Sequence, residues 1–489
     1  MPNPVDPTPI DPITMKILIV ADGRLSFDQT DYGLALLVEA LREQSGPVAT
    51  FDVKKGYRRS VTTNMNDSNG PGSDYPDFRF VGDDLGDQYD QVWFFGDQED
   101  KLDATGQPTL RTTQLTGEEA GIISRFMQKG GGVFATGDHE SLGSTLGAYL
   151  PRVRTMRVWR NGPPENLQDP ERNDTINNDV PVGSPPSEQD AFPQKILPRF
   201  FPTPSSPQPY PHPLLDGPRG VINVLPDHVH EGVCREPSPT ELDEDDYPTR
   251  NSFRAVPLIV AYSRSRASTS RPPFGAIGTY DGHTVNLGRI VVDASFHHFL
   301  NSNLKPLKEK AGVAYGDIKR YFQNIALWLA PPEKQQIMLA RALWTIRSRP
   351  IVSEALGDGS ISTAADASSL RTAGGVARSE LNRLVSPSLS RLWTIEMLTR
   401  LNPAFFSLYG YVRPGSAKRN FTVNLEQILD YTVGSVLKGM GSGPGPMAAL
   451  NLSTSIEELH GAVDAGARNA IDSLSEFVGK ETYDELFRS

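Results

Sequence analysis

Short apolar segments alternate with helical patterns through the first third of the chain, and this alternation limits the fold more than any other feature. Residues 15–20, 48–53, 89–96 and 133–136 have the apolar character of strands that are buried on both faces. Helical spacing of apolar residues follows the first strand and precedes the last one. Strands that alternate with helices build a mostly parallel sheet covered on both faces. The sequence therefore predicts an α/β fold.

A run of three glycines at residues 130–132 lies between a predicted helix and the strand at 133–136. Thr116 and Glu119 have the capping-box spacing that begins a helix. The glycines come before the strand and not after it, so we expect them to end the helix rather than to surround a phosphate. The polar turn Asp138-His139-Glu140 follows the strand.

Acidic residues follow three of the predicted strands. Asp22 comes after the first strand, Asp97 after the third and Asp138 after the fourth. Because ligands of parallel sheets gather beyond the carboxyl ends of the strands, we expect these side chains to share one edge and to form the floor of a site.

The chain divides into three predicted parts. Residues 1–14 are interrupted by five prolines and form a disordered tail. Residues 15–332 form the α/β domain, with a proline-rich insertion at about 157–254. Residues 333–489 show helical patterns and no strand pattern, which predicts an all-α C-terminal domain.

Composition excludes several classes of protein. A formal net charge of −11 argues against a protein that binds nucleic acid by neutralising phosphates. The single cysteine, Cys234, allows neither an internal disulfide nor a multi-cysteine zinc site. The first residues lack the pattern of a signal peptide, and no apolar run reaches the length of a membrane span. We expect a cytoplasmic protein that does not bind a membrane.

Six of the 8 histidines lie in short motifs, most of them beside carboxylates. Imidazoles and carboxylates transfer protons near neutral pH or bind divalent metals, so their clustering predicts a chemical site. The histidines are His139, His212, His228, His230, His297 and His298, and the nearby acids include Asp138, Glu140, Asp227, Glu231 and Asp293.

Three interpretations of these motifs stay open. In the first, His228 and His230 bind zinc, manganese or iron, because side chains two apart on an extended segment point the same way. In the second, His139 or His297 is an acid/base without a metal, and Asp138 or Asp293 orients it. In the third, these groups only hold the insertion against the sheet. The substrate contacts that we expect are Asp22, Asp97, Glu140, Asp227, Glu231 and His298.

The order of motifs over roughly residues 15–330 resembles the ThuA-like branch of the class I glutamine-amidotransferase-like superfamily. The resemblance rests on short segments that follow one another in this chain in the same order as in the family. They are the strand at 16–20, Tyr89-Asp90, Leu115-Thr116, the glycines at 130–132 with a histidine after the strand, the segment at 212–217, the strand from Gly288 with a histidine after it, and the helix ending at 325–330.

The resemblance implies a flavodoxin-like three-layer sandwich. It also implies that His139 and His297 lie in the polar pocket of a family that is associated with carbohydrate use. Members that transfer ammonia from glutamine use a cysteine in a Cys-His-Glu triad. Asp138 or His139 takes that position here, so we expect no glutamine amidotransferase activity.

Two functions therefore compete. The first is a hydrolase for a small polar, carbohydrate-related substrate, with His139 as the acid/base, Asp138 as its orienting partner, and His297 as a second polar wall. The second is a ligand sensor or scaffold without catalysis, in which the helical C-terminal domain mediates assembly with a second copy or another protein.

Overall fold

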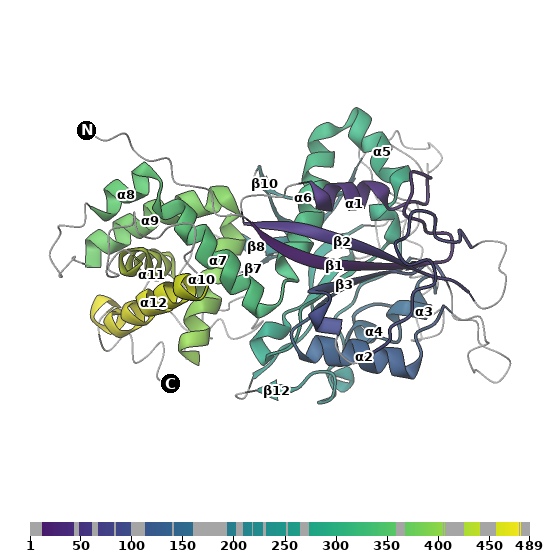
Figure 1. The fold of residues 1–489 in the computed structure, drawn as a ribbon, viewed down its shortest axis with the longest axis horizontal. Helices are drawn as coiled ribbons and strands as arrows, with labels where there is room; N and C mark the ends of the chain where they lie inside the picture. Colours follow the sequence, from purple (N-terminus) through teal and green to yellow (C-terminus); the bar gives the residue numbers. More distant parts are fainter. Residues whose placement is uncertain are drawn as a thin grey trace.

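The structure of the protein is a computed structural model, in which an α/β region is followed by a run of helices (Figure 1). It describes residues 12–43, 48–60, 67–82, 85–98, 113–138, 141–159, 193–201, 209–217, 219–227, 231–250, 253–264, 273–357, 367–403, 405, 425–440, 456–478 and 480.

One eight-stranded sheet organises the α/β region, and most of it is parallel. Its strand order is β2-β1-β3-β4-β16-β15-β14-β6, and the first five strands run parallel. With β16 in fifth place, this is the 2-1-3-4-5 order of flavodoxin-like sheets. The five strands are β1 (Ile13–Asp22), β2 (Ala49–Arg58), β3 (Gln91–Phe95), β4 (Gly132–Thr136) and β16 (Ile290–Asp293).

The other three strands are antiparallel and extend the sheet beyond β16. β15 (Phe274–Tyr280) is a strand that we did not predict, because two glycines, an alanine and a threonine interrupt its apolar pattern. β14 (Leu258–Ser263) agrees with prediction, whereas β6 (Leu197–Pro198) comes from the proline-rich insertion. The insertion thus supplies an edge of the sheet.

The insertion also contains four short strand pairs. They are β5 (Gln194–Lys195) with β11 (Val224–Leu225), β7 (Phe200–Phe201) with β8 (Tyr210–Pro211), β9 (Asp216–Gly217) with β10 (Gly220–Val221), and β12 (Thr249–Arg250) with β13 (Phe253–Arg254).

Helices cover both faces of the sheet, as Figure 1 shows. α1, α5 and α6 lie above it in that view, and α2, α3 and α4 lie below it. The bounds are α1 (Ala35–Arg42), α5 (Asn301–Lys310), α6 (Gly312–Trp328), α2 (Gly117–Gln128), α3 (Ser144–Gly147) and α4 (Val153–Met156).

The predicted capping box and the glycine run have the roles expected of them. Thr116 Oγ1 accepts from the Glu119 amide at 3.2 Å, and the Glu119 carboxylate accepts from the Thr116 amide at 3.0 Å. Gly130 has a positive φ of 94° directly after the helix end. A side chain at Gly132 would overlap the Leu329 carbonyl, so glycine allows the end of α6 to approach β4 closely.

The helical run begins at the amino edge of the parallel strands, where Pro332 lies against Gly130. The described residues of this part of the chain form helices, as its helical patterns predict. The helices are α7 (Pro332–Arg347), α8 (Pro350–Leu356), α9 (Ala367–Leu384), α10 (Pro387–Leu401), α11 (Leu425–Gly439) and α12 (Ile456–Val478).

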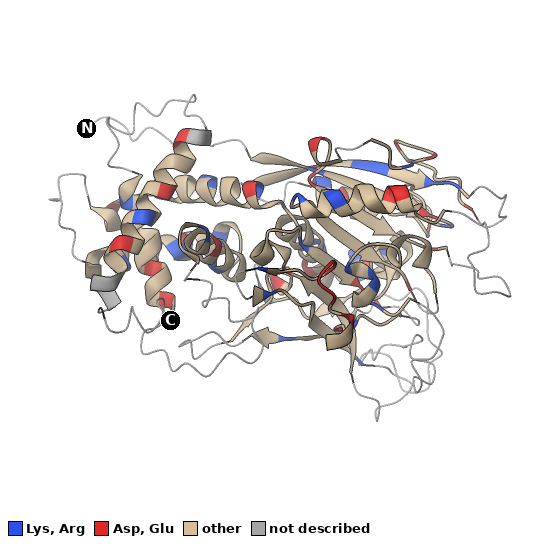
Figure 2. Ribbon diagram, turned by 90° about the horizontal axis from the view of Figure 1, so that it is seen from below, with Lys and Arg blue, Asp and Glu red and all other residues tan. Residues whose placement is uncertain are grey.

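Charges of both signs are interspersed along these helices and across the α/β region (Figure 2). Within the described ranges, no helix is both long enough and apolar enough to cross a membrane.

A matched pair of glycines in α9 tests the packing of the helical run. A Cβ at Gly374 would overlap the Asp430 carbonyl of α11, whereas one at Gly375 would make an ordinary contact at 3.6 Å with the Asp430 side chain. We expect Gly374→Ala to lower the free energy of unfolding by about 1–3 kcal/mol through overpacking. Gly375→Ala should raise it by up to about 1 kcal/mol, because alanine favours a helix. Denaturant unfolding measures both changes, and equal stability of the two variants would contradict this packing.

Candidate functional site

Asp22 connects the ends of two neighbouring parallel strands. Its Oδ1 accepts from the amides of Asp97 at 2.7 Å and Gln98 at 3.1 Å, just after β3. Its Oδ2 accepts from Thr145 Oγ1 at 2.8 Å. The side chain is fully buried, and burial raises the pKa of Asp22 to about 6, although these hydrogen bonds oppose the shift. Asp22 therefore fixes the turn that carries Asp97.

Arg24 and Asp97 form an ion pair at the same edge. Arg24 Nη2 lies 2.6 Å from Asp97 Oδ1, and Arg24 Nε lies 3.0 Å from Asp97 Oδ2. The Arg24 side chain is 41% exposed, and its Nη1 has no hydrogen-bond partner among the described residues. These hydrogen bonds raise the pKa of Arg24, and the charge of Asp138 adds to the shift. Arg24 therefore offers a free donor to solvent within electrostatic reach of Asp138.

Asp138 and His297 meet because β4 and β16 are adjacent and parallel. Their register pairs Thr136 with Asp293, so the residues after each strand lie side by side. His297 Nε2 lies 3.2 Å from Asp138 Oδ2, and Ser295 Oγ donates to Asp138 Oδ1 at 3.0 Å. The Asp138 side chain is 0% exposed and that of His297 is 9% exposed. A fully buried carboxylate thus lies against an imidazole that is itself largely buried.

Other side chains contact the two strand ends and the His297 ring. Arg157 Nη2 donates to the carbonyls of Asp138 and Ala294, at 2.7 Å each, and so joins the two strand ends. Tyr32 lies edge-on to the His297 ring, with centroids 6.1 Å apart, and the Arg24 guanidinium lies 4.8 Å from the Tyr32 ring centroid. Arg24, Tyr32 and His297 therefore form one continuous row of contacts, and the buried Asp138 carboxylate lies against the last of them.

His298, the neighbour of His297, points inward to different carboxylates. Both residues lie in a 3-10 turn, η5 (Phe296–Phe299). His298 Nδ1 lies 2.6 Å from Asp293 Oδ1, and its Nε2 lies 2.6 Å from Glu231 Oε1. Gln194 Nε2 also donates to Glu231 Oε1, and Tyr321 of α6 donates to Asp293 Oδ2 at 2.8 Å.

The charge of this inner cluster follows from its burial and its partners. Burial alone lowers the pKa of His298, but Asp293 and Glu231 more than offset burial and raise the pKa of His298 to about 10. Burial raises the pKa of Glu231 above its usual range, although the contact with His298 opposes this. His298 is therefore an imidazolium held between two buried carboxylates.

The structure brings the predicted residues together in pairs. Asp22 meets Asp97, Asp138 meets His297, and Glu231 meets His298. Asp227 lies beside α5, where its carbonyl accepts from Asn303 Nδ2 at 2.6 Å. Four predicted residues lie outside the described residues: His139, Glu140, His228 and His230.

Glu231 and His298, which we expected to contact substrate, are fully buried behind the strand ends. Both side chains therefore lie beneath the Asp138–His297 pair and not at the surface. Cys234 is buried as well, and burial raises the pKa of its thiol.

The described residues contain a group of metal-type ligands elsewhere, namely Asp281, His283 and Glu396, whose ligand atoms lie within 4.8 Å of one another. The guanidinium of Arg289 donates to both carboxylates of this group. A guanidinium between the carboxylates repels a metal ion, so this group is occupied by a cation of the protein itself.

Several residues of the site were missed by sequence reasoning. Arg24 stands in the turn after the first strand, so the rule that located Asp22 could have located it. Ser295 stands two residues before His297. Tyr32, Gln194 and Tyr321 carry no local signal, because they reach the site from distant parts of the chain.

The pKa of Asp22 gives a test of this arrangement. Because its folded pKa of about 6 exceeds the ordinary value of 3.8, the protonated form stabilises the fold, and this contribution is lost as pH rises through 6. Asp22→Asn keeps the oxygen acceptor and cannot ionise. We expect the stability of the variant relative to wild type to rise by about 2 kcal/mol between pH 4 and pH 7.5, at about 1.4 kcal/mol per tenfold change in proton affinity. Denaturant unfolding at the two pH values measures this, and a difference that does not vary with pH would contradict it.

Comparisons of the chain with protein families, with curated proteins and with solved structures find no match. The resemblance to the ThuA-like family therefore stays a prediction. A function is therefore inferred from the chemistry of the residues at the carboxyl edge of the sheet.

Proposed function

We propose that the carboxyl edge of the sheet binds a small polar molecule and hydrolyses it, with His297 as the acid/base. The observation that carries this proposal is the contact of His297 Nε2 with the buried Asp138 carboxylate at 3.2 Å. A carboxylate in this position can fix the orientation of an imidazole. Such a pair can take a proton from a water molecule and return it to a leaving group.

The surroundings of the pair support a polar substrate. Arg24 Nη1 is a donor at the exposed edge, and a guanidinium can stabilise negative charge that develops during hydrolysis. Ser295 holds Asp138 from the other side through its hydroxyl. In this proposal Asp138 and Ser295 are positioning residues, His297 transfers the proton, and Arg24 binds the substrate.

The ThuA-like resemblance favours a carbohydrate-related substrate within this proposal. The flavodoxin-like strand order agrees with the fold that the resemblance implies. His297 stands after the strand in the position of the family's second histidine. Fold analogy alone does not assign an activity, so the substrate class has to be measured.

A substrate panel with matched variants tests the proposal. We expect the protein to hydrolyse at least one member of a panel of glycosides, esters and amides of small polar compounds. His297→Asn should lower kcat/KM by roughly a hundredfold or more, which is the usual contribution of a positioned acid/base. Arg24→Met should raise KM more than it lowers kcat.

Arg199→Met is a control for the loss of an arginine, because Arg199 pairs with Glu236 at 2.8 Å on the surface. It should leave kcat/KM unchanged. Full activity in His297→Asn would contradict the assignment of the acid/base. Binding of a panel member that depends on Arg24 and His297, with no turnover of any compound, would replace the hydrolase with a ligand-binding protein.

A further inference from the structure

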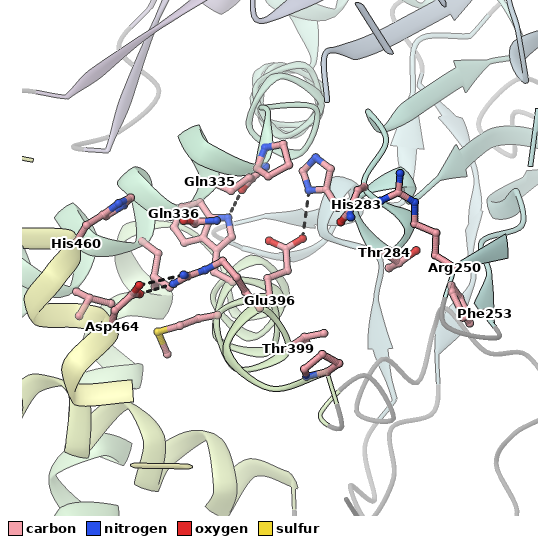
Figure 3. A pocket seen from close by; sticks show the side chains of 18 residues that line it. Arg250, Phe253, His283, Thr284, Gln335, Gln336, Glu396, Thr399, His460 and Asp464 are labelled. Carbon is pink, nitrogen blue, oxygen red and sulfur yellow. Dashed lines mark hydrogen bonds and ion pairs between the residues drawn. The ribbon is translucent and has the colours of Figure 1, made fainter. Parts of the chain in front are cut away.

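A pocket lies at the opposite edge of the sheet, between the α/β region and the helical run. It encloses about 540 Å³, which is within the usual size range of sites for small molecules. Its walls come from the segment after β15 and from α7, α10 and α12 (Figure 3). Arg289 precedes β16 and Asp293 ends it, so this pocket and the Asp138–His297 site lie at opposite ends of one strand.

One wall of the pocket has an excess of negative charge. Arg289 donates to Asp281 at 2.8 Å and also to Glu396, so two carboxylates share a single guanidinium. The Arg289 side chain is 0% exposed, whereas that of Glu396 is 16% exposed. A molecule in the pocket therefore meets the Glu396 carboxylate and not the guanidinium behind it. Contact with Arg289 keeps the pKa of Glu396 low despite its burial, so this side chain is ionised at neutral pH.

The same wall presents the Glu396 carboxylate as a hydrogen-bond acceptor, next to the buried His283. His283 Nδ1 lies 3.4 Å from Glu396 Oε1, and Figure 3 shows Glu396 reaching toward His283. His283 Nε2 has no hydrogen-bond partner among the described residues. Burial lowers the pKa of His283, so its ring is neutral and adds no positive charge to the wall. A ligand of this wall has to bring donors.

The rest of the pocket is largely apolar or already paired. Leu339, Met397 and Val463 contribute apolar side chains from α7, α10 and α12. Arg400 and Asp464 line the pocket but bind each other through two hydrogen bonds. Their charges cancel. Arg250 of β12 also lines the pocket, beside Phe253 of β13, whereas Glu396 is the carboxylate that stays available to a ligand beside Met397 of α10.

We propose that this pocket binds a small amphipathic amine, with its ammonium group on Glu396 and its apolar part against Leu339, Met397 and Val463. An ammonium supplies the donors that the wall lacks and neutralises its excess negative charge. An organic cation fits better than a metal ion, because Arg289 already binds the carboxylates that a metal would need.

Three probes of similar shape and different charge test the proposal on the full chain. We expect phenethylamine to bind at millimolar concentrations by calorimetry, 2-phenylethanol to bind at least about tenfold more weakly, and phenylacetate not to bind. Glu396→Gln should weaken phenethylamine binding by about tenfold or more. The double variant Arg400→Met/Asp464→Asn is the matched control, because it removes an ion pair that lines the same pocket and leaves the net charge of the pocket unchanged, and it should change the affinity by less than about twofold.

A variant that fills the pocket tests where the amine binds. It leaves the contacts of Arg289 with Asp281 and Glu396 unchanged. Gln336 lines the pocket, so Gln336→Trp should abolish phenethylamine binding while the protein keeps its far-ultraviolet circular dichroism. The proposal is overturned if phenylacetate binds as well as the amine, if no amine binds to the wild-type protein, or if Gln336→Trp binds the amine with unchanged affinity.

Discussion

The charged ring of His298 between Asp293 and Glu231 is the interaction on which the carboxyl edge of the sheet depends. It joins four parts of the chain: Asp293 ends β16, Glu231 and Gln194 belong to the insertion, and Tyr321 comes from α6. All of these groups are buried, so each charge is stable only while its partners are present. Loss of one partner from a buried ion pair typically costs about 3–5 kcal/mol, because the other charge stays buried alone. The insertion is therefore held against the sheet by charge as well as by packing.

This interaction also sets the geometry of the exposed site. His298 and His297 are consecutive in the 3-10 turn η5, so the contacts that fix the first ring determine where the second one points. Asp293 binds His298 and also accepts from the Ser295 amide at 3.1 Å, while the Ser295 hydroxyl donates to Asp138. A chain of hydrogen bonds thus runs from the buried cluster to Ser295, whose hydroxyl also accepts from the backbone amide of His297 at 3.2 Å. Rigid support of this kind is what a proton-transfer pair requires.

The sequence predicted those features that follow from local pattern and from the rules of parallel sheets. Strand and helix alternation led to the sheet, and its strand ends led to Asp22, Asp97, Asp138 and His297. It did not predict the contacts that depend on three-dimensional packing. β15 was missed because small residues interrupt its pattern, although its neighbours in the sheet hold it as a strand. His283 and His460 stand alone in the sequence, yet both line the pocket between the sheet and the helical run. Gln194 and His298 are 104 residues apart, and no local pattern connects them.

The protonation state of His298 tests the central claim most directly. Nitrogen-15 NMR of the imidazole rings, with His298→Gln used for assignment, reports whether each ring nitrogen carries a proton. We expect both nitrogens of His298 to be protonated at neutral pH and to remain so until the pH approaches 10, at which its pKa lies. A neutral His298 ring at pH 7, with a single protonated nitrogen, would contradict the buried ion cluster and with it the proposed support of the Asp138–His297 pair.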